Sequence, residues 1–182
     1  MAKINVFVKE EIAKLSKKDL EKLVVKAASM NKQFHDYLMV NYVDTELGEQ
    51  DLYEECLADL NVLYRKGYKG FSEELQLANM LATCSKRINE FAKVCKNKTF
   101  EMNLILDVLE IPFSISTNSF GTCFTKYDYQ VYLLVKKAIT LLKTKVHEDF
   151  YIEYAPKLNE YLTILHRTSS HLDYIYSMPK QI

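Results

Sequence analysis

The chain has 182 residues, of which 48% are hydrophobic, and 24 basic side chains balance 24 acidic ones, so it is long enough for one globular domain of ordinary size. Only four glycines and three prolines occur, which favours long helices and excludes the glycine-rich loops of P-loop and dinucleotide-binding proteins. The zero formal net charge gives no general attraction to nucleic acid or to an anionic membrane, so neither is favoured as a partner.

Three helical segments are expected at the amino terminus. Residues 4–15 mix charged and apolar side chains and lack the hydrophobic run and cleavage pattern of a signal peptide, so we expect no secretion. Ser16 and Asp19 have the spacing of a capping box and predict a second helix. Asn31 is suited to cap a third helix that ends near Val43, and together these segments should form a compact helix pair.

A resemblance appears within this region. The segment LSKKDLEKLVVKAASMNKQFHDYL, residues 15–38, resembles a Leu-Ser-Lys-x-x-Leu motif followed by a second helix, an arrangement found in bacterial helical proteins. The whole chain, including the terminal LHRTSSHLDYIY, is similar to a bacterial family of about this length that has no assigned activity. The resemblance implies an all-helical fold, and it carries over no functional residue.

Charge is segregated in the middle of the chain, where we expect a loop over residues 44–48 and a helix over 49–66. An acidic run without positive charge comprises Asp44, Glu46, Glu49, Asp51, Glu54, Glu55 and Asp59. A basic run comprises Lys86, Arg87, Lys93, Lys96 and Lys98. We interpret both as solvated helix faces, with a docking surface or a head-to-tail homo-oligomer as the alternative. Nucleic-acid binding by the basic run would require a strongly salt-dependent association.

The longest helix is expected over residues 73–97, with Ser72 as its N-cap. Its large apolar side chains recur at intervals of three and four, at Leu77, Leu81, Cys84, Ile88, Phe91 and Cys95. A second row of small residues runs beside them, at Ala78, Ala82, Ser85 and Ala92. A helix with two such stripes can pack against two neighbours, so we expect it at the centre of the molecule.

The four cysteines, Cys56, Cys84, Cys95 and Cys123, include no Cys-x-x-Cys pair. Two of them lie on the apolar stripe of the central helix, so the cysteines resemble small buried hydrophobic residues of a protein in the reducing cytoplasm. Cys123 is the exception, because it lies in an irregular stretch where a reactive thiol is conceivable. The longest uncharged run, residues 111–125, is too short to cross a bilayer, so we expect no membrane partner.

A sixth helix should begin at Thr99 and end before Pro112. Residues 112–125 form the long irregular stretch, which is either a functional loop or an ordinary packed connection. Its candidate site residues are Ser116, Thr117, Asn118, Gly121 and Cys123. Residues 126–150 predict a long helix, and a last helix should have Pro156 in its first turn and extend through Ile175.

Polar residues gather on this last predicted helix, in two rows at helical spacing. The cluster comprises His166, Arg167, Ser170, His171, Asp173 and Tyr174. Imidazole, carboxylate and guanidinium groups together suit acid and base chemistry or anion binding. The alternative, which we favour, is that these groups tie the helix to the loop by hydrogen bonds. The chain has no Glu-x-x-His pair, zincin spacing or nucleophile elbow, so we expect no metal and no other cofactor.

The sequence therefore predicts an all-α protein, a single domain over residues 1–182 with seven or eight helices in an irregular bundle or as stacked helical hairpins. The favoured function is a noncatalytic protein-interaction module in the cytoplasm, with an apolar or tyrosine-rich surface patch and no deep polar pocket. The alternative is a small-molecule or anion-binding protein, with or without catalysis, that uses the polar cluster together with the loop at 112–125.

Overall fold

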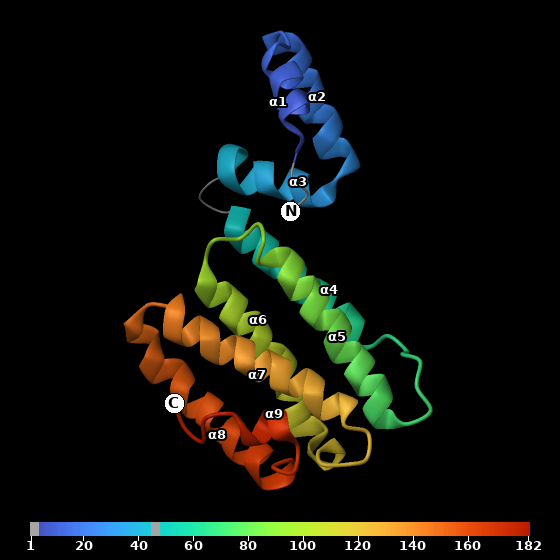
Figure 1. Ribbon diagram of the computed structural model, residues 1–182, viewed down its shortest axis with the longest axis vertical. Coiled ribbons are helices and arrows are strands. Elements are labelled where there is room, and N and C mark those ends of the chain that lie inside the picture. Colours follow the sequence, from blue (N-terminus) through green and yellow to red (C-terminus); the bar gives the residue numbers. More distant parts are fainter. Residues whose placement is uncertain (1–3, 45–47) are drawn as a thin grey trace. The chain divides into compact units, whose positions relative to one another are not determined.

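Every regular element of the computed structural model, which describes residues 4–44 and 48–182, is helical (Figure 1). The all-α class and the irregular bundle are therefore confirmed. Over these residues the chain forms nine α-helices, eight of which have seven residues or more. The chain divides into two compact units, residues 1–48 and 49–182, which we call the amino-terminal and carboxy-terminal units. A single domain over the whole chain stays a prediction, and the expected loop at 44–48 falls largely outside the described residues.

The amino-terminal unit consists of α1 (Val6–Ala13), α2 (Lys17–Met30), α3 (Lys32–Leu38) and a π-helical turn (Met39–Val43). The side chain of Ser16 accepts a hydrogen bond from the backbone N–H of Asp19 at 3.2 Å. Asn31 likewise accepts from the N–H of Phe34 at 3.1 Å. Both predicted N-caps are confirmed, because a cap needs only residues three positions apart.

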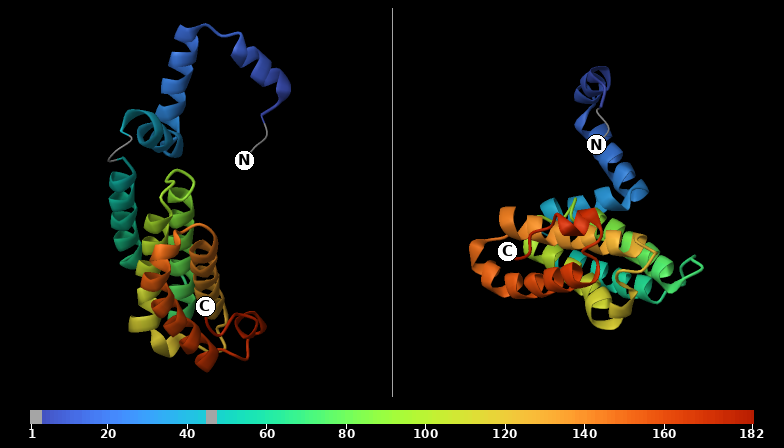
Figure 2. Two further views of the ribbon diagram at one scale, coloured as in Figure 1. Left: turned by 90° about the vertical axis from the view of Figure 1, so that its left-hand side faces the viewer. Right: turned by 60° about the horizontal axis from the view of Figure 1, so that its bottom comes forward.

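This unit has helices but almost no core. Its α2 packs against α3, whereas α1 leaves α2 at an open angle (Figure 2). Among described residues 4–44, Val40 alone is buried. The apolar side chains of these helices are therefore not covered by other residues of the same unit.

The carboxy-terminal unit holds the core. Its elements are α4 (Gly48–Tyr64), α5 (Glu73–Phe91), α6 (Lys98–Glu110), a π-helical turn (Ile111–Ile115), a 3-10 turn (Thr117–Ser119), α7 (Lys126–Thr144), a 3-10 turn (Glu148–Phe150), α8 (Tyr151–Thr168) and α9 (Asp173–Tyr176). Figure 1 shows α7 between the pair α5 and α6 on one side and α8 on the other. Because α7 also contacts α9, it shares the central position that the sequence predicted for α5.

The predicted apolar stripe of α5 is confirmed. Leu81, Ile88 and Phe91 are each at most 1% exposed, and Cys84 is fully buried. Ser72 caps the helix, since its hydroxyl accepts from the N–H of Leu75 at 3.3 Å. The helix ends at Phe91, however, six residues before the predicted end.

The early end of α5 has a tertiary cause. Glu49, in the first turn of α4, accepts hydrogen bonds from the backbone N–H groups of Lys96 at 2.7 Å and Asn97 at 3.3 Å. These N–H groups therefore do not bond to carbonyls of the preceding turn, as a continuing helix would require. Asn97 in turn accepts from the N–H of Thr99 at 3.0 Å, so the predicted Thr99 cap is wrong and Asn97 caps α6.

The predicted last helix is also revised. It begins earlier, at Tyr151, so that Pro156 lies inside α8 rather than in its first turn. The hydrogen bond that Pro156 cannot donate would have gone to Ile152, whose position is exposed to water. The helix ends at Thr168, and α9 follows as a separate short helix. Ser169 leaves the helical conformation with φ −130° and directs its hydroxyl to a buried carboxylate.

Candidate functional site

The predicted polar cluster does not lie on one helix. His166 and Arg167 are in the last turn of α8, whereas Asp173 and Tyr174 begin α9. The expected alignment of the six residues in two helical rows is therefore wrong, because the backbone turns at Ser169. Most of the cluster is exposed to solvent, namely Arg167, Ser170, His171 and Asp173.

The two half-buried members of the cluster bond to backbone groups. Nε2 of His166 lies 3.4 Å from the carbonyl oxygen of Pro179. The hydroxyl of Tyr174 donates to the carbonyl of Thr125 at 3.1 Å. Pro179 lies near the carboxyl terminus and Thr125 at the end of the loop. Among the described residues, these two side chains therefore bond to groups outside the cluster and not to other members of it. A binding site formed by His166 and Arg167 with the loop hydroxyls stays a prediction.

The loop at 112–125 is packed against the helices at some positions and exposed at others. The carbonyl of Ser116 accepts a hydrogen bond from the buried Tyr127 hydroxyl at 3.4 Å. Thr117 and Asn118 are exposed members of a 3-10 turn, and Cys123 is exposed beyond it. The backbone N–H of Gly121 donates to a carboxylate of α7 at 3.1 Å.

That carboxylate, Asp128, joins three segments. It is fully buried, and its Oδ1 accepts hydrogen bonds from the Gly121 N–H and from the Ser169 hydroxyl, while Oδ2 has no partner within the described residues. A Cβ atom on Gly121 would overlap the carbonyl oxygen of Thr168 and lie 3.8 Å from Cε1 of His171. The fold thus brings the predicted loop and the α8–α9 connection together, but through Asp128 and Ser169, which sequence reasoning missed.

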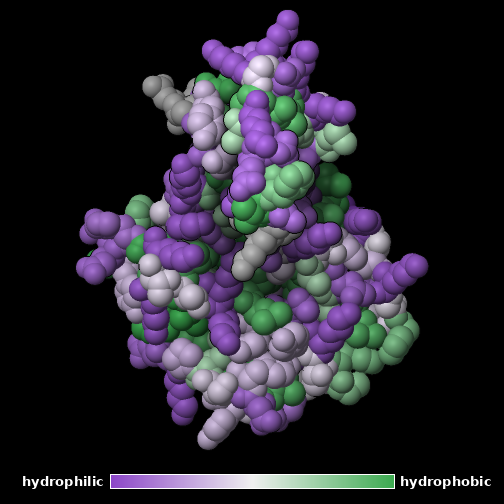
Figure 3. All heavy atoms as spheres, turned by 45° about the horizontal axis from the view of Figure 1, so that its top comes forward, coloured by the Kyte–Doolittle hydropathy of each residue, from purple (hydrophilic) through white to green (hydrophobic). Residues whose placement is uncertain are grey.

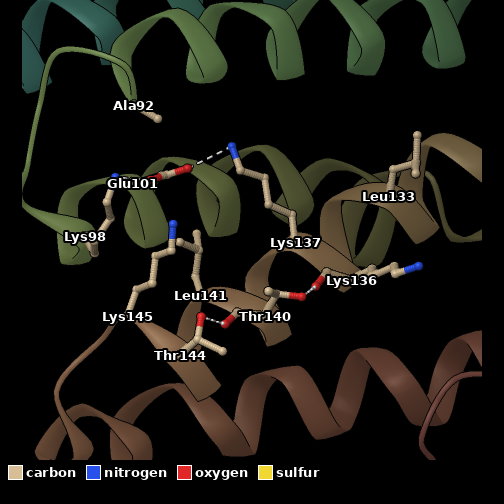
Figure 4. A pocket seen from close by; sticks show the side chains of 10 residues that line it. All are labelled: Ala92, Lys98, Glu101, Leu133, Lys136, Lys137, Thr140, Leu141, Thr144 and Lys145. Atoms are coloured by element: carbon tan, nitrogen blue, oxygen red, sulfur yellow. Dashed lines mark hydrogen bonds and ion pairs between the residues drawn. The ribbon is translucent and has the colours of Figure 1, made fainter.

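A second polar arrangement lies in an open groove of about 470 Å³ between α6 and α7 (Figure 4). The groove is lined by Ala92, Lys98, Glu101, Leu133, Lys136, Lys137, Thr140, Leu141, Thr144 and Lys145. Glu101 is 4% exposed, and its carboxylate binds the ammonium groups of Lys98 at 2.9 Å and Lys137 at 2.8 Å. Burial alone would raise the pKa of Glu101, but the hydrogen bonds from Lys137 and Lys98 outweigh it and lower the pKa.

Sequence reasoning missed most of this groove. It placed Lys98 in the basic run and singled out no lysine of the helix predicted over residues 126–150 as a site residue. The available signal was the spacing of four that puts Leu133, Lys137 and Leu141 on one side of α7, with Lys145 directly after the end of the helix. The position of α6, which supplies Glu101, could not be read from that spacing.

The acidic and basic runs partly face each other within the carboxy-terminal unit. Nε of Arg87 lies 2.7 Å from Oδ2 of Asp59, an ion pair between α5 and α4. Lys98 is engaged by Glu101, as described above. Two of the five basic residues expected to face solvent therefore already have carboxylate partners, which weakens the case for nucleic-acid binding by this run.

The amino-terminal unit presents most of the exposed apolar side chains. These are Ile4, Val6, Phe7, Val8, Leu15, Leu23, Val24, Val25, Met30, Tyr37, Met39, Tyr42 and Val43, here called the amino-terminal apolar surface. The carboxy-terminal unit, nearly three times as long, has eight such residues. Figure 3 shows apolar and charged side chains next to one another on the molecular surface.

Comparisons with family models, with curated proteins and with solved structures found no match to this chain. Across residues 4–44 and 48–182, no three His, Cys, Asp or Glu side chains are grouped so as to hold a metal ion. No helix in these two ranges has both the length and the apolar character needed to cross a membrane.

Proposed function

We propose that the protein is a noncatalytic protein-interaction module whose amino-terminal apolar surface binds a partner protein. The observation that carries this proposal is that, among its described residues, thirteen large hydrophobic side chains are exposed and a single residue is buried. Burying one such side chain fully is worth about 1.5–3 kcal/mol, so covering even a few of them supplies substantial binding energy. A unit of 48 residues also buries too little surface for more than marginal stability of its own.

The helices of this unit need such a partner for their own stability. They have 8, 14 and 7 residues, and isolated helices of about 12–15 residues are marginal in water. In most proteins an apolar face packed against a neighbour supplies the missing stability. Binding would therefore order this unit as well as join it to its partner.

The charges around the apolar surface indicate the chemistry of the partner. Lys18, Lys22 and Lys26 follow one another at intervals of four along α2 and line a shallow groove with Val25 and Glu21. Lysine side chains outnumber carboxylates in this groove. The best match is an amphipathic helix whose apolar stripe is bordered by acidic residues, since such a helix covers Val25 and pairs with the lysines.

The test compares two valines of equal exposure in the full-length protein. Val25 on α2 is 68% exposed and Val62 on α4 is 69% exposed, so Val62→Gln is a matched control for Val25→Gln. The partner retained from an extract of the source cells would be purified, and its affinity for each variant measured by calorimetry. We expect Val25→Gln to weaken binding about tenfold and Val62→Gln to leave it unchanged. Equal losses from both variants, or no retained partner, would contradict the proposal.

We also propose a cytoplasmic location. The four cysteines are all unpaired, which supports a reducing compartment. Fractionation of the source cells with an antibody against the protein tests this, and recovery in an oxidising compartment would refute it.

A further inference from the structure

The groove between α6 and α7 concentrates positive charge around one buried carboxylate. Figure 4 shows Lys98, Lys137 and Lys145 with their ammonium groups directed toward Glu101. Three ammonium groups and one carboxylate leave a local charge of about +2 at neutral pH. Lys98 and Lys137 are partly withdrawn from water, with 24% and 30% of their side-chain surfaces exposed, which weakens the screening of this charge.

These lysines have hydrogen-bond donors to spare. Each ammonium group carries three N–H bonds. Lys98 uses one on Glu101, and Lys137 uses two, on Glu101 and on the side chain of Asn89 at 2.7 Å. Lys145 has no hydrogen-bond or ion-pair partner among the residues that the structure describes, although it points into the groove. Several donors therefore face a common space without an acceptor.

The remaining walls of the groove are mostly apolar or already satisfied. The hydroxyls of Thr140 and Thr144 donate to carbonyls of the preceding turn of α7, so the donors available to a ligand come from the lysines. Leu133, which is 39% exposed, provides apolar surface one helical turn from Lys137, whereas Leu141 is only 5% exposed. A volume of about 470 Å³ falls within the range of sites for small molecules.

We propose that this groove binds a small phosphate monoester, with the phosphate held by Lys98, Lys137 and Lys145 and its organic part against Leu133. A phosphate monoester carries up to two negative charges near neutral pH, which matches the local charge, and its three terminal oxygens match the spare donors. The site lies within the carboxy-terminal unit and is independent of the proposed partner-binding surface.

Calorimetric titration of the full-length protein at constant ionic strength tests this proposal, with phenyl phosphate and inorganic phosphate as probes. We expect saturable binding of one phenyl phosphate, several-fold tighter than inorganic phosphate because the ring covers the exposed surface of Leu133. Equal affinity for the two probes would overturn the proposed organic ligand in favour of free phosphate. No saturable binding of either probe at about 10 mM would overturn the site altogether.

Substitutions at two neighbouring lysines distinguish a specific binding site from nonspecific charge attraction. Lys145→Gln removes a lining ammonium group that has no partner in the described chain, so it should weaken phenyl phosphate binding about tenfold without lowering the melting temperature. Lys143→Gln removes the same charge from an exposed position that does not line the groove, and should change affinity less than twofold. Equal weakening by both variants would show nonspecific charge attraction and overturn the proposal.

Discussion

At the scale of single residues, Gly121 has both an unusual backbone conformation and a crowded position. Its φ is +69°, a region that residues with a side chain rarely adopt, and the Thr168 carbonyl lies where a Cβ would be. The sequence identified Gly121 through the composition of its loop. Its hydrogen-bond partner Asp128 also accepts from Ser169, and this second contact was not predictable, because it depends on how α7 and α8 pack across about forty residues of chain.

Gly121→Ala should destabilise the protein by about 3 kcal/mol, the combined effect of a strained φ and of overlap with Thr168. Urea denaturation followed by circular dichroism measures this loss. Gly67→Ala is the matched control, because nothing lies within 4 Å of its added Cβ, and it should change stability by less than about 0.5 kcal/mol. Similar losses in both variants would argue against the tight contact at Gly121.

The cysteines provide a second prediction at this scale. Burial raises the pKa of Cys56 to about 11 and the pKa values of Cys84 and Cys95 to about 12, so these thiols stay protonated at pH 8 and are also inaccessible. Cys123 is exposed. Iodoacetamide at pH 8 should therefore modify Cys123 alone in the native protein and all four thiols in urea, as mass spectrometry can count. Comparable native labelling of a second cysteine would contradict the buried positions.

At the scale of helices, the sequence predicted the first residues of the helices better than their last residues. Ser16, Asn31 and Ser72 cap their helices as predicted, because each cap is a contact between residues close in sequence. The ends of α5 and α8 depend instead on Glu49 and Asp128, which reach them from other helices. These partners are distant in sequence, so the residues around each helix end do not predict them. The helical spacing of apolar residues also continues past both ends.

The link between α6 and α7 predicts a dependence of stability on pH. The lowered pKa of Glu101 means that the folded protein holds this carboxylate charged at a pH where the unfolded chain already binds a proton. Its contribution is therefore present above the ordinary pKa and is lost as pH falls through the lowered one. Glu101→Gln should cost about 2 kcal/mol at pH 7 and flatten the decline in stability as the pH falls below the ordinary pKa of a glutamate.

Chemical denaturation at a series of pH values measures this difference. Glu153→Gln, at an exposed position on α8, is the control and should keep the wild-type profile. If Glu101→Gln also followed the wild-type curve at every pH, the ion pairs with Lys98 and Lys137 would contribute nothing to stability.

At the scale of the whole molecule, composition was enough to predict the all-α class, since so few glycines and prolines leave long helical stretches. The division at residue 48 was not predicted. The apolar pattern of α2 shows that the helix has a hydrophobic face, but a pattern does not show whether that face is covered. The same limit explains why the exposed surface of the amino-terminal unit emerges only from the structure.

The central claim is that this surface is uncovered in the isolated protein and available to a partner. Amide hydrogen exchange of the full-length protein, read by mass spectrometry, tests it most directly, because exchange reports local opening. We predict that amides of α2 exchange at least about a hundredfold faster than those of the buried α7, and slow when the partner is added. Protection of α2 equal to that of α7 in the isolated protein would contradict the claim, since its apolar face would then already be covered.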